Sequence, residues 1–238
     1  MRNYNKEAKI IIENFPYPHE FTDPYVVLVS TVLSQRTKDE NTRKATIQLF
    51  DKYKDVNEIS KLNPEDIYDL IKPAGMYKQK SERIIKLSKI IVEEHNSKVP
   101  ADIDELVKLP GVGRKTANIV LYVSFNQKAM AVDTHVHRIA NRLGWINTKK
   151  PDDSEFEIMK IISKDLWGPL NGSMVAFGQQ VCKPRKPKCE ICPLNKYCDY
   201  YKENSNETVY LLVKLSFFIE ILYFSCIIIH KYNRGDFY

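Results

Sequence analysis

Apolar residues recur at helical spacing along most of this sequence, whereas the two-residue alternation of a half-buried strand is rare. Residues 81–94 show the pattern most clearly and predict an amphipathic helix. Capping signals mark helix starts at Asp23 and Asn63, each followed by proline, and at Asp102, which can cap a short helix ending near residue 108. The pattern predicts an all-α fold. Other helices are expected near residues 7–14, 25–34, 40–53, 114–123, 135–143, 155–166 and 173–181.

The composition is that of a soluble globular protein with a modest positive charge. Hydrophobic residues make up 43% and charged residues 28% of the 238 positions, so the chain can bury a sizeable core. The net charge of +6 favours a polyanionic partner, although an excess of this size is common in proteins that bind no nucleic acid. The N-terminus lacks the apolar core of a signal peptide. This predicts a cytoplasmic protein whose clustered cysteines bind metal rather than form disulfides.

A glycine-rich turn, Leu-Pro-Gly-Val-Gly-Arg-Lys-Thr-Ala at residues 109–117, lies between two expected helices. Gly111 and Gly113 allow the backbone to take positive φ and to approach a ligand closely. The free N–H groups at the start of the next helix then suit a phosphate, which they would hold without reading any base. The alternative is a glycine C-cap within an ordinary turn between helices.

Lys115 and Asp133 are the candidate catalytic residues. A free lysine amine at the start of the helix after the turn could attack a sugar C1′ and form a Schiff base. Taken alone, Lys115 would more often be a solvated lysine or a phosphate contact. Asp133 follows the apolar run 129–132 and precedes an expected helix, so it is a favoured N-cap. One carboxylate can both cap a helix and take part in catalysis.

Four cysteines, Cys182, Cys189, Cys192 and Cys198, lie within 17 residues at the spacing C-x6-C-x2-C-x5-C. Four thiolates this close in sequence can surround one metal centre. Both zinc and a [4Fe-4S] cluster accept four cysteines, and the number of ligands does not distinguish between them.

Together these motifs resemble the endonuclease III family of DNA glycosylases. The turn at 109–117 and its apolar continuation are similar to the family's helix-hairpin-helix, Val-Asp-Thr-His at 132–135 to its aspartate motif, and the cysteine spacing to its cluster loop. The resemblance covers about residues 4–201. The domains that it implies are a six-helix barrel at 21–133, with the helix-hairpin-helix near 103–123, and an iron–sulfur cluster domain built from 1–20 and 134–204.

The resemblance implies base excision repair of double-stranded DNA that carries a damaged base or an abasic site. Lys115 would attack C1′, Asp133 would stabilise the positive charge developing on the sugar, and loss of the 3′ phosphate would nick the strand. Relatives that only remove adenine from mismatches lack the lysine. Its presence favours a bifunctional glycosylase and lyase for damaged, oxidised pyrimidines. A monofunctional mismatch glycosylase, a non-catalytic DNA-binding module and a cluster-based redox sensor are the alternatives.

The resemblance further implies a monomer that has no small-molecule substrate. Its four cysteines would hold a [4Fe-4S] cluster, and the cluster would keep a basic loop against phosphates. Met76 would enter the duplex as a wedge, and a polar residue would fill the hole left by the extruded base. An ungapped alignment puts Arg36 at the family's glutamine position, so Gln35 and Arg36 compete for that role. Core packing for Met76 and a solvated basic loop are the alternatives. The residues expected to contact DNA are Gln35, Arg36, Met76, Gly111, Val112, Gly113, Arg114, Lys183, Arg185, Lys186 and Lys188.

The tail at 205–238 lies outside the resemblance. Its apolar part, 209–229, has 21 residues, close to the roughly 20 that span a bilayer. Glu220 lies near its middle and disfavours insertion into a membrane. Three interpretations of this tail compete: a membrane anchor, a helix that packs on the domain or on a partner, and a non-native extension from a shifted reading frame. We favour an extension that is irrelevant to catalysis. Cys226 fits no ligand pattern and is expected to be a buried thiol.

Overall fold

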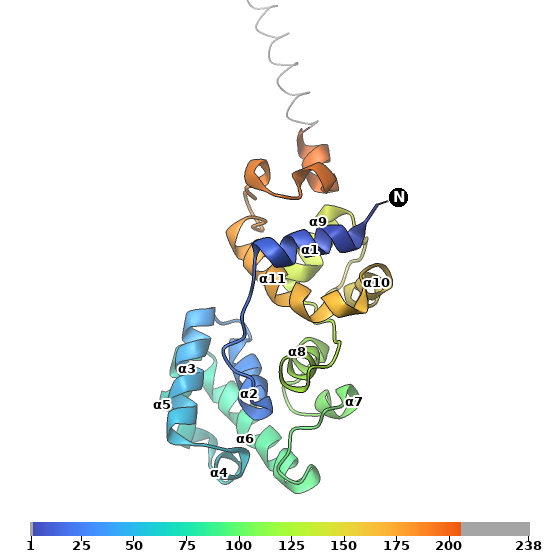
Figure 1. The fold of residues 1–238 in the computed structure, drawn as a ribbon. Coiled ribbons are helices and arrows are strands. Elements are labelled where there is room, and N and C mark those ends of the chain that lie inside the picture. Colours follow the sequence, from blue (N-terminus) through green and yellow to red (C-terminus); the bar gives the residue numbers. More distant parts are fainter. Residues whose placement is uncertain (1, 206–238) are drawn as a thin grey trace, which may run out of the picture.

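The computed structural model describes residues 2–205, and all regular secondary structure in that part of the chain is helical. The expected all-α fold is confirmed. Figure 1 shows two lobes, one containing α2 to α8 and the other containing α1, α9, α10, α11 and the cysteine-bearing segment. The α-helices are α1 (Tyr4–Asn14), α2 (Pro24–Ser34), α3 (Asp39–Lys52), α4 (Val56–Ser60), α5 (Tyr68–Ile71), α6 (Tyr77–Glu94), α7 (Ile103–Leu106), α8 (Arg114–Phe125), α9 (Thr134–Leu143), α10 (Pro151–Ile161) and α11 (Trp167–Gln180). The 3-10 helices are η1 (Pro64–Ile67), η2 (Lys72–Ala74), η3 (Lys164–Leu166), η4 (Cys189–Ile191) and η5 (Asn195–Tyr197).

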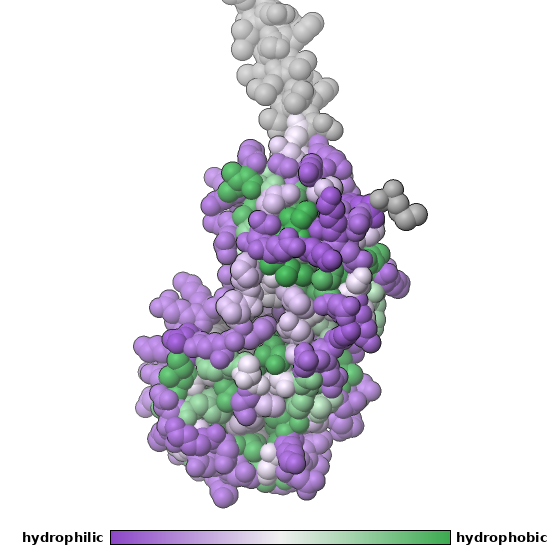
Figure 2. All heavy atoms as spheres, viewed as in Figure 1, coloured by the Kyte–Doolittle hydropathy of each residue, from purple (hydrophilic) through white to green (hydrophobic). Residues whose placement is uncertain are grey.

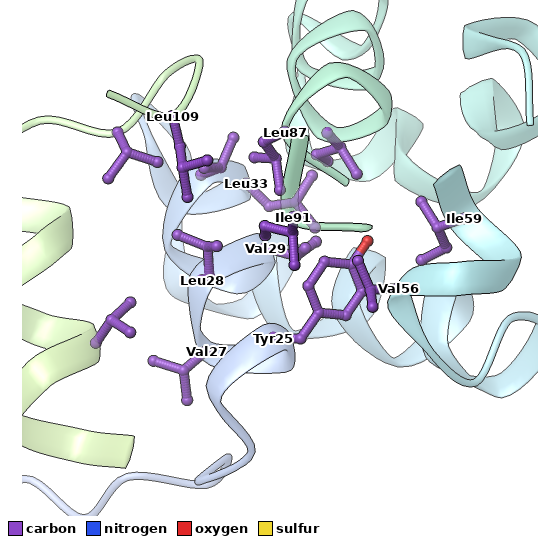
Figure 3. Close-up of a cluster of buried hydrophobic side chains, with 14 of the residues drawn as sticks. Tyr25, Val27, Leu28, Val29, Leu33, Val56, Ile59, Leu87, Ile91 and Leu109 are labelled. Carbon is purple, nitrogen blue, oxygen red and sulfur yellow. The ribbon is translucent and has the colours of Figure 1, made fainter. Parts of the chain in front are cut away.

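The core of the first lobe forms around α2, whose side chains are mostly apolar. Asp23 caps this helix, as the sequence predicts, by accepting hydrogen bonds from the N–H groups of Tyr25 and Val26. Helix α2 contacts α3, α6 and α8. Because it has neighbours on several sides, most of its side chains are buried, and Leu28 and Leu33 are fully so (Figure 3).

The core of the second lobe draws on both ends of the described chain. Buried residues of α1 pack with apolar residues between Met130 and Cys198, and α1 lies against α11. The first core, by contrast, takes its buried residues from 25–129. The last buried residue of the first core is thus Ala129, and Met130 and Val132 already belong to the second core.

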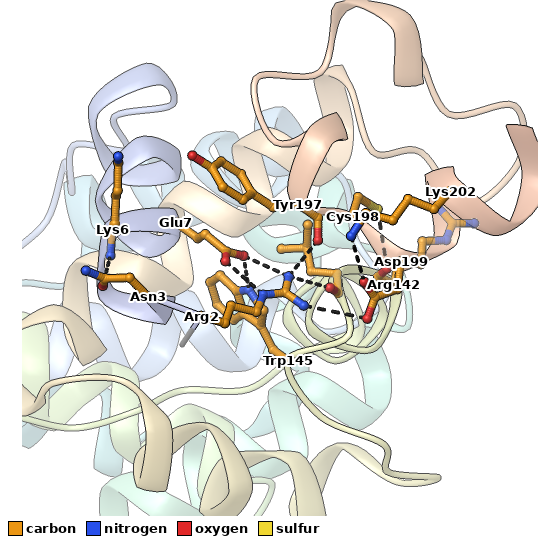
Figure 4. A network of polar contacts seen from close by, with 11 residues as sticks. Arg2, Asn3, Lys6, Glu7, Arg142, Trp145, Tyr197, Cys198, Asp199 and Lys202 are labelled. Atoms are coloured by element: carbon orange, nitrogen blue, oxygen red, sulfur yellow. Dashed lines mark hydrogen bonds and ion pairs between the residues drawn. The ribbon is translucent and has the colours of Figure 1, made fainter.

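A buried carboxylate fastens α1 to the rest of the second lobe (Figure 4). Glu7 is only 1% exposed. Its Oε1 accepts a hydrogen bond from Arg2 Nε at 2.8 Å, and its Oε2 accepts one from Trp145 Nε1 at 2.7 Å. Arg2 Nη2 also donates to the main-chain oxygens of Leu143, at 2.6 Å, and Tyr197, at 2.8 Å. Helix α1 therefore holds both the end of α9 and the turn η5, which directly precedes Cys198.

Replacing Glu7 with alanine should lower the free energy of unfolding by about 3 kcal/mol, because it leaves a partly buried guanidinium and an indole N–H without their acceptor. Glu13→Ala is the matched control, since Glu13 is an exposed carboxylate on the same helix. Urea denaturation of both variants measures the difference. Equal stability of the two variants would contradict a role for this carboxylate in joining α1 to the lobe.

Helix α11 begins at Trp167, well before residue 173, so the expected span of 173–181 is wrong at its start. The added turn contains Gly168 and Gly172, residue types that disfavour a helix when only the sequence is considered. A Cβ at Gly168 would lie 2.0 Å from the ring of Tyr122. The glycine therefore permits close packing with α8, and burial outweighs its weak helix propensity.

Two other predicted spans are also wrong at their ends. Helix α6 begins at Tyr77 rather than near residue 81, and α10 covers Pro151–Ile161 rather than 155–166. The short helix α4 was not expected, because five residues are too few to show a helical period. The helix start expected at Asn63 is present, and the chain there forms η1 followed directly by α5. Such errors at helix ends leave the order of the long helices unchanged.

Met1 and residues 206–238 lie outside the described part of the chain, and with them the apolar segment 209–229 and Cys226. Within residues 2–205, no helix is both long and apolar enough to cross a membrane.

Candidate active site and metal centre

The two lobes meet at a narrow waist (Figure 2). A cleft of about 990 Å³ is lined by both lobes, and Lys115 and Asp133 are among its lining residues. The structure thus brings the two predicted catalytic residues to one open space. Lys115 is the second residue of α8, and Asp133 immediately precedes α9.

The predicted hairpin joins α7 to α8. Asp102 caps α7 as expected, by accepting from the N–H groups of Asp104 and Glu105. Gly111 has a φ of 81°, a conformation that favours glycine, and a Cβ there would lie 2.8 Å from Cδ of the Arg83 side chain, which would have to move.

Gly113 differs from its expected conformation. Its φ of −100° and ψ of 175° are extended backbone that any residue can adopt, so the positive φ expected there is wrong. Gly113 is exposed, and an added Cβ would meet no atom within 4 Å. It precedes α8 without a side-chain cap. The first N–H groups of α8 therefore lie beside open space, where a phosphate oxygen can approach them. Val112 is buried and anchors the turn in the first core.

Lys115 is half-buried and lies on the face of α8 that borders the cleft. Ile119 and Val123, one and two turns further along α8, line the cleft as well. The amine therefore stands at the open end of an apolar stripe, close to the N-terminus of its helix.

Asp133 is an N-cap, as its sequence context predicts. Its Oδ1 accepts hydrogen bonds from the N–H groups of His135, at 2.8 Å, and Val136, at 2.9 Å. These bonds fix the carboxylate at the mouth of the cleft. Burial lowers the pKa of His135, and Arg138 and Lys115 lower it further against the opposing effect of Asp133.

Among the cleft residues that were not expected from the sequence are Tyr17, Asp39 and Gln179. Gln179 Nε2 on α11 donates to Asp39 Oδ2, at the start of α3, at 3.0 Å, which joins the lobes across the cleft. Burial raises the pKa of the Tyr17 hydroxyl, and the charges of Asp39 and Asp133 raise it further. No motif contains these residues, because they come from three distant segments.

The segment after α2 places Gln35 and Arg36 differently. Gln35 Nε2 donates to the main-chain oxygen of Gly111 at 2.8 Å, and its Oε1 accepts from Arg83 Nη1 at 3.2 Å. Arg36 is exposed, with a φ of 54°. Both residues line the cleft. Gln35 therefore ties its segment to the hairpin, whereas no hydrogen bond or ion pair to the described residues engages the Arg36 side chain.

Met76 takes the left-handed conformation, with a φ of 48°, directly before α6. Its side chain is 49% exposed. Core packing, the alternative for this residue, does not match that exposure. An exposed methionine on a strained turn is the arrangement that a wedge into a duplex requires.

Arg114 was expected to contact DNA, but its side chain has another partner. Its Nη2 lies 2.5 Å from Oε1 of Glu155, which is 3% exposed. Its Cζ also lies 5.2 Å from the centre of the Phe156 ring. The guanidinium therefore joins the hairpin to α10, and only the backbone N–H of Arg114 is left for the expected contact with DNA.

The four cysteines border one cavity, together with Arg142, Leu143, Phe177 and aromatic residues near the end of the described chain. Burial, together with the charges of the neighbouring thiolates, raises the pKa of the Cys192 thiol to about 11. Four adjacent thiolates therefore need a cationic centre between them. Within residues 2–205, no three His, Cys, Asp or Glu side chains converge on a point that could hold a single ion. Four thiols around one cavity are the ligand set that an iron–sulfur cluster takes.

Two arginines of α9 hold the cluster loop by its main chain, and sequence reasoning did not find them. Arg142 donates to the main-chain oxygens of Lys183, at 2.7 Å, and Pro184, at 2.8 Å. Arg138 Nη2 donates to the oxygen of Cys182 at 2.8 Å. Arg142 Nη1 also lies 3.6 Å from Cys182 Sγ. None of these contacts uses a basic side chain of the loop, and those side chains stay exposed. They are Lys183, Arg185, Lys186 and Lys188.

Replacing Cys192 with alanine should remove the cluster, because one of four thiolates is lost. Bound iron should fall from about four atoms per chain to below one. Cys226→Ala is the control, since the fifth cysteine lies outside the spacing pattern and should leave the iron content unchanged. Colorimetric iron determination on both variants measures this. Full iron in Cys192→Ala would contradict its assignment as a ligand.

Comparison with known proteins decides the family. A profile described as the HhH-GPD superfamily base excision DNA repair protein matches residues 29–164. Another, the iron-sulfur binding domain of endonuclease III, matches residues 182–198. Endonuclease III of Thermotoga maritima is 55% identical over 202 residues, covering 85% of this chain and 95% of that protein. The chain belongs to the endonuclease III family.

Solved structures of endonuclease III agree with this membership. A non-covalent endonuclease III–DNA complex superposes with a TM-score of 0.80 at 34% identity, covering 87% of this chain and 99% of that one. A trapped endonuclease III–DNA covalent intermediate gives a TM-score of 0.79 at 35% identity, covering 86% and 99%. The expected two-domain fold, the enzyme class of DNA glycosylase and AP lyase, and the [4Fe-4S] cluster domain are thereby confirmed.

Proposed function

We propose that this endonuclease III acts on double-stranded DNA. It removes damaged, oxidised pyrimidines and then cleaves the abasic strand through a Schiff base on Lys115. One observation carries the assignment of these roles: Lys115 and Asp133, from the starts of α8 and α9, line the same cleft. A lysine that only bound phosphate would not need a carboxylate across the same open space.

Lys115 supplies the nucleophile. Its amine forms a bond to C1′ as the bond between C1′ and the base breaks, and the base departs with the electron pair and takes up a proton. Asp133 stabilises the positive charge that develops on the sugar, in a position fixed by its two cap bonds. The product of this attack is an aminal, and it becomes an iminium when the C1′–O4′ bond breaks and O4′ takes up the proton that the amine has lost. Loss of a C2′ proton from the iminium then expels the 3′ phosphate and leaves a nicked strand.

Several elements around the cleft would hold the kinked duplex. The N–H groups at the start of α8 suit one phosphate, and the exposed cations of the cluster loop suit others. Met76 would enter the stack from the wedge turn. We assign hole filling to Arg36, whose side chain is unengaged, and assign Gln35 to fixing the loop on the hairpin. When bound, the cluster cross-links four thiolates and so keeps the basic loop in place.

Borohydride trapping tests the function. Wild-type protein is incubated with a duplex carrying thymine glycol, an oxidised pyrimidine, or an abasic site, and with the undamaged duplex. Reduction of a Schiff base leaves a covalent adduct on the two damaged substrates only. Base release without an adduct, from protein with its full iron content, would leave a monofunctional glycosylase. Binding with neither product would leave a non-catalytic DNA-binding module.

A further inference from the structure

Lys80 is a buried cation that no step of the proposed reaction uses. It lies in the first turn of α6 and is only 1% exposed. Its Nζ donates three hydrogen bonds: to the Leu33 oxygen at 2.7 Å, to Thr37 Oγ1 at 2.7 Å and to the Ala74 oxygen at 2.8 Å. Burial lowers the pKa of Lys80 to about 8. An apolar side chain of similar length would avoid this cost of burying a charge.

The acceptors show what the ammonium holds together. Leu33 lies in the last turn of α2, and Ala74 is the last residue of η2. Carbonyls at helix C-termini lack partners within their helix and favour a cation. Two helix ends therefore converge on one ammonium. Thr37 reinforces the junction, because its hydroxyl also donates to the Ala74 oxygen.

Both segments held by Lys80 carry an exposed residue with left-handed backbone. Arg36, between Leu33 and Thr37, has a φ of 54°, and Met76, just after Ala74, has a φ of 48°. Left-handed backbone at residues other than glycine persists only where the surroundings impose it. The Lys80 bonds to Leu33 and Thr37 lie on either side of Arg36 in the chain, and the bond to Ala74 lies two residues before Met76.

A second basic residue extends the junction to the hairpin. Arg83, about one turn after Lys80 on α6, donates through Nη1 to Gln35 Oε1. Gln35 in turn donates to the Gly111 oxygen. The start of α6 therefore connects the segment after α2, the wedge turn and the phosphate-facing hairpin.

We propose that Lys80 is a positioning residue that fixes Met76 and Arg36 relative to each other, so that both can enter the duplex when the damaged base is extruded. This inference rests on the proposed function, because it concerns how that active site handles paired DNA. Lys80 itself does not touch the reacting atoms. Its loss should impair steps that need base extrusion and spare the attack of Lys115 on a sugar that is already accessible.

The test compares Lys80→Met with Lys86→Met on two substrates. Lys86 is an exposed lysine of the same helix and serves as the matched control. One substrate is a duplex carrying thymine glycol, which must be extruded from the stack. The other is a single-stranded oligonucleotide with an abasic site, which has no opposite base and leaves no hole to fill. We expect Lys80→Met to lower excision from the duplex about tenfold or more, with single-strand trapping within about twofold of wild type.

A fluorescent base reports the positioning directly. 2-Aminopurine is placed opposite the lesion, and its fluorescence rises when the damaged base that it faces leaves the stack. We expect this rise to be lost in Lys80→Met and kept in Lys86→Met. A variant that was merely less stable would lose activity on both substrates in proportion to its folded fraction.

Thr37 provides a milder pair of variants in case Lys80→Met folds poorly. Thr37→Val removes one acceptor of Lys80 with little change of shape, whereas Thr37→Ser keeps the hydroxyl. Duplex excision should fall about threefold to tenfold in Thr37→Val and recover in Thr37→Ser, with single-strand trapping unchanged in both.

The outcomes separate this inference from the function on which it rests. If wild-type protein traps abasic DNA and Lys80→Met loses duplex and single-strand activity equally, or loses neither, the positioning role is overturned and the function stands. Wild-type protein that traps on neither substrate overturns the proposed function, and this inference with it.

Discussion

Lys115→Ala should form no borohydride-trapped adduct with abasic DNA, and should excise thymine glycol at least about a thousandfold more slowly than wild type. The reason is chemical: alanine has no amine to bond to C1′, so neither the iminium nor the elimination that follows from it can form. Duplex binding should persist, because the backbone N–H groups of the hairpin and the cluster loop remain.

Lys89→Ala is the matched control, since Lys89 is exposed on α6. It should trap abasic DNA as wild type does. A phosphate-binding role for Lys115 predicts a different pattern, in which Lys115→Ala binds DNA more weakly but still gives an adduct when saturated. That pattern would move the nucleophile to another amine.

Asp133→Asn should lower excision by about 10²- to 10⁴-fold while leaving the stability of the protein within about 0.5 kcal/mol of wild type. Asparagine caps a helix as well as aspartate does, and its side-chain oxygen can accept the same bonds from His135 and Val136. What it removes is the negative charge beside the developing positive charge on the sugar.

Asp133→Ala completes the comparison. It should lose the charge and the cap together, which lowers the free energy of unfolding by about a further 1 kcal/mol. Single-turnover excision and urea denaturation measure the two effects separately. If Asp133→Asn kept full activity, the carboxylate would be a helix cap and nothing more.

The sequence predicts best those features that local segments contain. Asp133 follows an apolar run and begins a helix, so its cap could be predicted without the fold. Gly111 lies in a turn whose neighbours demand positive φ. The four cysteines lie within one short loop, so their spacing alone limits how they can be arranged. In each of these cases the deciding contacts are made by residues close in the chain.

Features that depend on the packing of distant segments escaped prediction. Arg114 carries the signature of a hairpin that binds phosphate, yet its guanidinium pairs with Glu155 on another helix. Lys80 resembles a solvated lysine at a helix start, and only the convergence of two helix ends makes it a buried donor. Asp39 and Gln179 meet across the cleft, and no local pattern connects them.

The contribution of α1 to the second core has a consequence for the order of maturation. The buried residues of the first core, 25–129, form one continuous stretch, so this lobe can fold while the ribosome is still adding later residues. The second core cannot close at that stage, because α1 must wait for partners that lie between Met130 and Cys198. The cluster cysteines come after this whole stretch in the chain, so the first lobe can already be folded when iron and sulfide reach them.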